Sequence, residues 1–132
     1  MLWVFDVDGC LIDSLTGTSL RPGARELLAT LRRDGHRIVL WSAGGADYAR
    51  QCAAIHDIDA HVDEFHDKAT RDEQRRYLVS AFAADLRGAV FVDDHPEDLP
   101  IDAEVIEVSP YLSHNPHDRV LAAVQERAVS RS

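Results

Sequence analysis

The chain of 132 residues is 45% hydrophobic and 28% charged, which is typical of a globular protein with one core. A net charge of −9 argues against a nucleic-acid-binding surface, and no apolar run is long enough to cross a membrane. Two cysteines, Cys10 and Cys52, are too few for a disulfide framework or a zinc cluster. We therefore expect a single cytoplasmic domain over residues 1–132, with free thiols and no membrane partner.

Unbroken apolar runs predict strands that are buried on both faces, as in a parallel sheet. The first run occupies residues 2–5, and a helix follows, whose apolar stripe begins at Ala24 and whose C-terminal cap is Gly35. The second strand is predicted at residues 38–41.

A second helix begins after Gly45, and its spacing predicts that Tyr48, Cys52 and Ile55 share one buried face. A short third strand is expected around residues 61–65. Strands and helices thus alternate along the chain, as they do in parallel α/β sheets.

The pattern continues with a helix over about 70–84 and with strands at 89–92 and 105–108. Asn115-Pro116 is typical of a helix start, and the last residues, about 129–132, are expected to fray. The predicted fold is a three-layer Rossmann-like α/β domain, with a central parallel sheet of about five strands and helices on both faces.

Polar residues follow three of these strands directly: Asp6 and Asp8 after the first, Ser42 after the second, and Asp93 with Asp94 after the fourth. The carboxyl ends of parallel strands meet at one edge of the sheet, where open α/β sheets bind their ligands. Three such strand ends together predict a functional site.

Carboxylates at this edge suit phosphoryl chemistry with a metal ion. Asp6 is a candidate nucleophile that forms an aspartyl-phosphate, and Mg²⁺ held by Asp6, Asp93 and Asp94 would offset the repulsion between carboxylate and phosphate. Asp8 is then free to protonate the leaving group and to deprotonate the attacking water.

Phosphate ligands are predicted from the other strand ends. Ser42 offers a hydroxyl, and the amides of Ala43 and Gly44 lie near a helix N-terminus. Lys68 is the only lysine beside thirteen arginines, and its ammonium is placed to neutralise charge on phosphoryl oxygens.

These residues resemble the four motifs of haloacid dehalogenase (HAD) superfamily phosphohydrolases, in the order in which that superfamily has them. The motifs are Asp6-Val7-Asp8-Gly9, Ser42, Lys68 and Asp93-Asp94. The resemblance implies that Asp6 is the nucleophile, Asp8 the general acid and base, and Ser42 and Lys68 phosphate ligands. It also implies a Mg²⁺ site made by Asp6, the Asp8 backbone carbonyl and Asp93.

The resemblance has one departure, because Cys10 stands where the superfamily usually has Thr or Val. We expect Cys10 to support the loop without reacting. The second aspartate, Asp8, is absent from members that displace halide, and it favours phosphate esters.

Neither of the two positions where such enzymes carry a cap domain leaves room for one. A flap over about 11–20, with Gly17 as a hinge, is the expected local cover, so the resemblance is to the small capless type. The expected substrate is phosphorylated and large enough to cover the site, unless a neighbouring subunit of an oligomer does so.

Alternative functions remain open at this stage. They are a polynucleotide-end (3′-phosphate) phosphatase, a non-catalytic HAD-like phosphate-binding module and a phospho-accepting receiver domain. The order of motifs in receiver domains fits this chain poorly, and the net charge weighs against a nucleic-acid substrate.

Two further groups of residues carry no firm assignment. His61, Asp63 and His66 are either a second metal site or, as we favour, part of a solvated edge of the sheet. His95, Tyr111, His114 and His117 are expected near the active edge, without a defined role.

Overall fold

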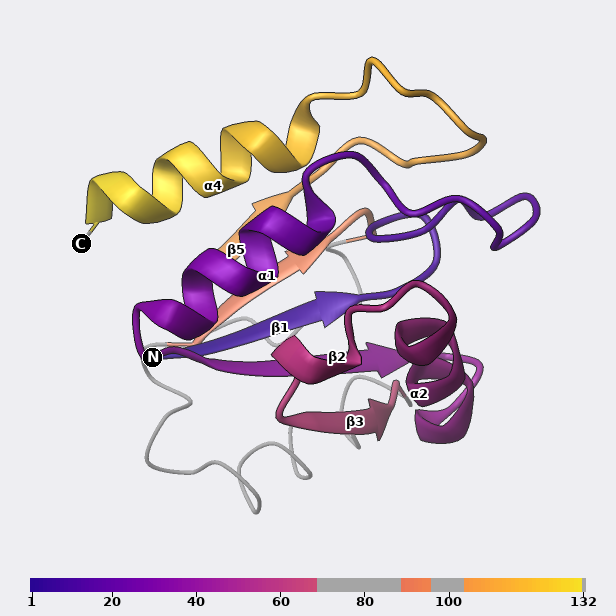
Figure 1. The fold of residues 1–132 in the computed structure, drawn as a ribbon, viewed down its shortest axis with the longest axis horizontal. Helices are drawn as coiled ribbons and strands as arrows, with labels where there is room; N and C mark the ends of the chain where they lie inside the picture. Colours follow the sequence, from indigo (N-terminus) through magenta and orange to yellow (C-terminus); the bar gives the residue numbers. More distant parts are fainter. Residues whose placement is uncertain (69–88, 96–103, 132) are drawn as a thin grey trace.

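The computed structural model describes residues 1–68, 89–95 and 104–131. Its sheet has five parallel strands in the order β3-β2-β1-β4-β5. These strands are β1 (Leu2–Asp6), β2 (Arg37–Ser42), β3 (Glu64–Asp67), β4 (Val90–Asp93) and β5 (Glu104–Glu107). The predicted parallel α/β sheet is confirmed, and Figure 1 shows the strand arrows pointing the same way.

The register of the sheet aligns the polar strand ends. Phe5 of β1 pairs with Leu40 of β2 and with Val92 of β4, so Asp6 and Asp93 follow at the same level. Ser42 pairs with the last residue of β3, Asp67. One edge of the sheet therefore carries the carboxylates and the serine side by side.

In the described residues, three helices pack against the sheet: α1 (Ala24–Arg33), α2 (Ala46–Ile55) and α4 (Val120–Arg131). All three contribute to one hydrophobic cluster with Trp3 and Phe5 of β1, and α1 and α4 run alongside each other (Figure 1). On the opposite face of the sheet, Leu2, Val4 and Trp41 are buried in a second cluster. The predicted helix over about 70–84 lies outside the described residues.

Helix α1 follows its predicted pattern, with a buried stripe from Ala24 to Leu31. Gly35 lies just past its end with φ of +86°, a backbone conformation that glycine adopts without strain. The amides of Gly35 and His36 donate to the carbonyl oxygens of Arg32 and Leu31, which closes the helix in a Schellman motif.

Strand β3 begins later than the predicted 61–65, because residues 59–61 form a 3-10 turn, η1 (Asp59–His61). Asp63 precedes the strand, and its carboxylate accepts a hydrogen bond of 2.8 Å from the Ile38 amide. Regular pairing with β2 therefore starts only at Glu64 and runs to Asp67. β3 is an edge strand, which agrees with the favoured interpretation of this acidic and histidine-rich segment.

The last helix begins at Val120, so the predicted start at Asn115-Pro116 is wrong. Asn115 caps only a turn, where its side-chain oxygen accepts from the His117 amide. The carboxylate of Asp118 accepts from the Val120 amide and so caps α4. The helix continues to Arg131, although the sequence predicts a frayed tail over 129–132. In the part of the chain that the structure describes, no helix is long and apolar enough to cross a membrane.

The predicted flap, residues 11–20, is an irregular loop with its own internal bonds. The Asp13 carboxylate accepts hydrogen bonds from the amides of Thr16 and Ser19 and from the Thr16 hydroxyl. Although desolvation raises the pKa of Asp13, these bonds lower it to about 2. The loop is therefore folded rather than loose.

The same loop is attached on two sides. The amides of Ser14 and Leu15 donate to the carbonyl oxygens of residues 111–112, both at 3.0 Å. On the other side, His56 Nε2 donates to the Gly17 carbonyl at 2.9 Å, since a carbonyl oxygen only accepts. Gly17, the expected hinge, is thus anchored to the end of α2.

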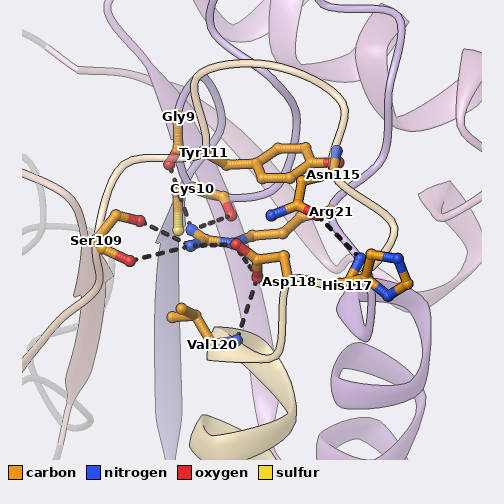
Figure 2. Close-up of polar contacts among 9 residues, drawn as sticks. All are labelled: Gly9, Cys10, Arg21, Ser109, Tyr111, Asn115, His117, Asp118 and Val120. Carbon is orange, nitrogen blue, oxygen red and sulfur yellow. Dashed lines mark hydrogen bonds and ion pairs between the residues drawn. The ribbon is translucent and has the colours of Figure 1, made fainter.

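A buried arginine holds this loop region together, as Figure 2 shows. The Arg21 side chain is fully buried and forms a bidentate ion pair with Asp118, with Nε at 2.9 Å and Nη2 at 3.2 Å. Its remaining N–H groups donate to the carbonyl oxygens of Gly9, Cys10 and Ser109.

The Arg21 contacts join three parts of the chain that are distant in sequence: the loop after β1, the segment after β5 and the N-terminus of α4. The Tyr111 ring lies under the guanidinium, 5.3 Å from its carbon to the ring centroid, and the Tyr111 amide donates to the Gly9 carbonyl. Arg21 therefore links the residues that follow Asp8 to the segment that follows β5.

We expect Asp118→Ala to destabilise the fold by about 3–5 kcal/mol, because it leaves the buried Arg21 charge without its partner. Urea unfolding at neutral pH measures the change. The matched control is Asp47→Ala, which removes an exposed ion pair with Arg50 and should cost under about 1 kcal/mol. Similar losses in the two variants would contradict the importance of the Arg21 cluster.

Candidate active site

A cavity of about 430 Å³ lies at the carboxyl ends of the strands. The predicted site residues that line it are Asp6, Asp8, Ser42, Ala43, Lys68 and Asp94. The lining is completed by Ser14, His95, Pro110 and Leu112. Of these four, only His95 was expected near the active edge from the sequence. Asp93 is fully buried beside the cavity. The structure thus brings all seven predicted side chains to one edge of the sheet.

The acidic side chains form a tight group around one ammonium. Asp6, Asp93 and Asp94 each place a carboxylate oxygen within 4.8 Å of the others. Lys68 Nζ lies 2.7 Å from Asp93 Oδ2 and 3.7 Å from Asp6 Oδ1. Burial and the nearby Asp93 charge raise the pKa of Asp6 to about 8, although Lys68 opposes the shift. Three carboxylates with one lysine leave an excess of negative charge in the site.

This group of oxygens fits a hard divalent cation such as Mg²⁺. Asp94 Oδ1 is buried, and it has no hydrogen-bond partner among the residues that the structure describes. A Cβ at Gly9 would lie 2.5 Å from Asp94 Oδ2, so the glycine, with φ of +78°, makes room for this carboxylate. An unpartnered buried oxygen inside an acidic group is what a metal site presents before its ion binds.

The Asp8 side chain is held apart from this acidic group. Tyr48 Oη donates a hydrogen bond of 2.6 Å to Asp8 Oδ1. Burial and this bond raise the pKa of Tyr48, so its hydroxyl keeps the proton that it donates. This bond leaves the second carboxylate oxygen of Asp8, Oδ2, unengaged by Tyr48, and Asp8 is not one of the three aspartates that converge.

Backbone hydrogen bonds order the loop after β2. The Ser42 hydroxyl oxygen accepts from the Gly44 amide at 3.0 Å, and the Ser42 carbonyl accepts from the amides of Gly45 and Lys68. The bond from the Lys68 amide holds the end of β3 beside this loop. The Lys68 side chain then places its ammonium next to Asp93. Ser42, Ala43 and Lys68 line the same cavity as the nucleophile candidate Asp6.

The buried face of helix α2 differs in part from the predicted one. Tyr48 and Cys52 lie on the expected face, but Ile55, in the last turn, is 77% exposed. His56 replaces it as the contact to the loop at Gly17. The sequence pattern identified Tyr48 only as an apolar contact, since hydropathy spacing carries no information about where its hydroxyl points.

The second candidate metal group, His61, Asp63 and His66, does not line the cavity. Asp63 is engaged by the Ile38 amide and by Arg32, so it does not join His61 and His66 in a metal site. Among the described residues, only the Asp6, Asp93 and Asp94 group has the geometry of a metal site.

Of the four residues expected near the active edge, His95 lines the cavity. Tyr111 is buried against Arg21 and its hydroxyl accepts from the Asn115 amide. His114 and His117 are exposed and do not line the cavity. Cys10 and Cys52 are free and buried, and the Cys10 thiol donates to the Val92 carbonyl, which agrees with a supporting role.

Solved structures with the same fold are known. The D,D-heptose 1,7-bisphosphate phosphatase from B. bronchiseptica, complexed with magnesium and phosphate, is 18% identical over 99% of both chains, with a TM-score of 0.62. An uncharacterized protein from Listeria monocytogenes serotype 4b is 15% identical over 98% of this chain and 97% of its own, with a TM-score of 0.67.

The D,D-heptose 1,7-bisphosphate phosphatase from Burkholderia thailandensis is 17% identical over 98% of each chain, with a TM-score of 0.54. At such identities the likeness concerns the fold. No curated protein sequence matches the chain.

The family comparison bears on the alternative functions. A model of the NLI interacting factor-like phosphatases matches residues 2–129, nearly the whole chain. That match favours a phosphatase over the receiver domain and the non-catalytic module. The chain belongs to the NLI interacting factor-like phosphatases, a family of the HAD type that hydrolyses phosphoric monoesters.

Proposed function

We propose that the protein is a Mg²⁺-dependent phosphomonoester hydrolase that works through an aspartyl-phosphate on Asp6, with Asp8 as general acid and base. The observation that carries the proposal is the division of the aspartates. Asp6, Asp93 and Asp94 converge on one point, whereas Asp8 is held separately by Tyr48. A neighbour of the same fold was solved with magnesium and phosphate, which supports the choice of ion.

In the first step the ionised Asp6 carboxylate attacks phosphorus. Asp6, Asp93, Asp94 and the Asp8 carbonyl would hold Mg²⁺, which would supply positive charge against the phosphate and favour the ionised carboxylate. Lys68, the Ser42 hydroxyl and the Ala43 amide bind phosphoryl oxygens. The raised pKa of Asp6 shows why this site needs such positive charge.

Asp8 handles the protons in both steps. Its protonated carboxyl donates to the leaving oxygen as the bond to phosphorus breaks. The resulting carboxylate then takes a proton from the water that attacks the aspartyl-phosphate, which releases inorganic phosphate and restores Asp6.

The substrate that suits the cavity extends beyond its phosphate. Residues 7–23 and 43–67, which the structure describes, hold only loops, α1's entry, α2, η1 and β3, with no inserted domain. We infer a phosphorylated macromolecule that covers the site itself, or a neighbouring subunit that does so. A net charge of −9 favours substrates other than polynucleotide 3′ ends. The free buried thiols suit the reducing cytoplasm, where we place the protein.

We expect Asp6→Asn to abolish turnover, because the amide cannot form the acyl-phosphate. Release of inorganic phosphate from a generic aryl phosphate with Mg²⁺ measures this. Asp47→Ala, on the exposed surface of α2, is the matched control and should keep wild-type activity. Near-wild-type turnover by Asp6→Asn would assign the nucleophile elsewhere.

The same substitution should stabilise the metal-free protein in a pH-dependent way. The pKa of Asp6 is about 8 in the fold and ordinarily 3.8, so the fold favours its protonated form. Its contribution to stability is full below about pH 4 and is lost as the pH rises through 8. In EDTA, the melting temperature of Asp6→Asn relative to wild type should therefore rise between pH 4 and 8. A constant difference across this range would contradict the buried charge at Asp6.

We expect Asp93→Ala to raise the Mg²⁺ concentration for half-maximal activity, because it removes one of three carboxylates from the acidic group. Activity titrated against Mg²⁺ measures the shift. Asp47→Ala again serves as the control. An unchanged titration curve would move the metal site away from Asp93.

A further inference from the structure

Tyr48 makes a short side-chain contact to the proposed proton donor, Asp8. It lies in the first turn of α2 and is half-buried, and its hydroxyl donates to Asp8 Oδ1 at 2.6 Å. Tyr48 is absent from the cavity lining, so it reaches the site only through Asp8. The proposed mechanism leaves this contact unexplained.

The surroundings of the Tyr48 ring fix its position. A Cβ at Gly44 would lie 2.9 Å from Tyr48 Cδ2, so the loop after β2 needs glycine there to admit the ring. On the other side, a Cβ at Gly17 would lie 4.0 Å from Tyr48 Oη. His56, two turns further along α2, holds Gly17 through its carbonyl. The ring is therefore held beside Gly44, and its hydroxyl bonds Asp8 near the loop at Gly17.

We propose that Tyr48 is a positioning residue for proton transfer, which orients the Asp8 carboxyl and stabilises its anion as the proton leaves. This inference rests on the proposed function. Because Oδ1 is occupied by the Tyr48 hydroxyl, the transferable proton sits on Oδ2. Tyr48 selects which oxygen of Asp8 faces the leaving group.

The step in question is departure of the leaving group, as Asp6 bonds to phosphorus. The phosphorus–oxygen bond of the ester breaks, and its electron pair stays on the leaving oxygen. That oxygen takes the proton from Asp8 Oδ2, and the carboxylate is left with a full negative charge. The Tyr48 hydroxyl keeps its own proton, and its hydrogen bond strengthens because the acceptor has become ionised.

This role predicts a dependence on the leaving group. Tyr48→Phe removes only the hydroxyl and keeps the ring that packs beside Gly44. With an alkyl phosphate, whose leaving oxygen is basic, kcat/KM should fall by about tenfold to a hundredfold, as expected for a hydrogen bond to a charged group. With 2,4-dinitrophenyl phosphate, which leaves without a proton, kcat/KM should change by less than about threefold. The ratio kcat/KM is compared because it reports the step in which the leaving group departs, whereas hydrolysis of the aspartyl-phosphate is common to both esters.

The matched control is Tyr111→Phe, which removes the hydroxyl of a buried tyrosine outside the cavity lining. It should leave the ratio of the two rates unchanged. The double variant Asp8→Asn/Tyr48→Phe provides a second measurement. If Tyr48 acts through Asp8, adding Tyr48→Phe to Asp8→Asn should lower kcat/KM on the alkyl phosphate by less than about twofold.

The outcomes separate this inference from the proposed function. If the wild type releases no phosphate from either ester with Mg²⁺, the proposed function itself fails. If the wild type is active and Tyr48→Phe lowers both rates equally, Tyr48 is only structural and the inference is overturned. A full additional loss in the double variant would also overturn it, because Tyr48 would then act independently of Asp8.

Discussion

A buried arginine is the constraint on which the active edge of this sheet depends. Arg21 gives its N–H groups to one carboxylate and to carbonyl oxygens of two separate loops, and its side chain has no exposed surface. A guanidinium in this position is costly unless every contact is made, so loss of Asp118 affects both loops at once. The cluster thereby holds the residues after Asp8 beside the segment after β5, whose Pro110 and Leu112 line the cavity.

The site holds several negative charges close together, which is unfavourable without a cation. Burial is the main cause of the raised pKa values of Asp6 and Asp93, and repulsion from the neighbouring carboxylates raises both further. Lys68 offsets part of this repulsion through its contact with Asp93, but it cannot neutralise three carboxylates. The fold around Arg21 therefore supports a group of charges that is unfavourable without a cation. Active sites commonly hold such unfavourable charges, and the stability of the surrounding fold offsets their cost.

Much of the architecture follows from local pattern in the sequence. The strand ends at Asp6, Ser42 and Asp93 were predictable because apolar runs and the polar residues after them are both visible in the chain. The start of α4 was not, because Asn115-Pro116 satisfies the capping rules as well as Asp118 does. Only the distant Arg21, which binds Asp118, decides between them. The Tyr48 contact to Asp8 was equally invisible, since it depends on how α2 is placed over the loop after β1.

The anchored loop changes what a site without a cap domain can do. Residues 14 and 15 are bonded to residues 111 and 112, and Gly17 is bonded to His56, so closure by a hinge at Gly17 would break an existing contact. The loop over residues 11–20 therefore forms a fixed wall of the cavity. Water would have to be excluded by the substrate or by a neighbouring subunit. Leu15 and Leu112 are 77% and 63% exposed on this wall. A substrate that extends past its phosphate would cover both, and that burial would favour its binding over that of a small phosphate ester.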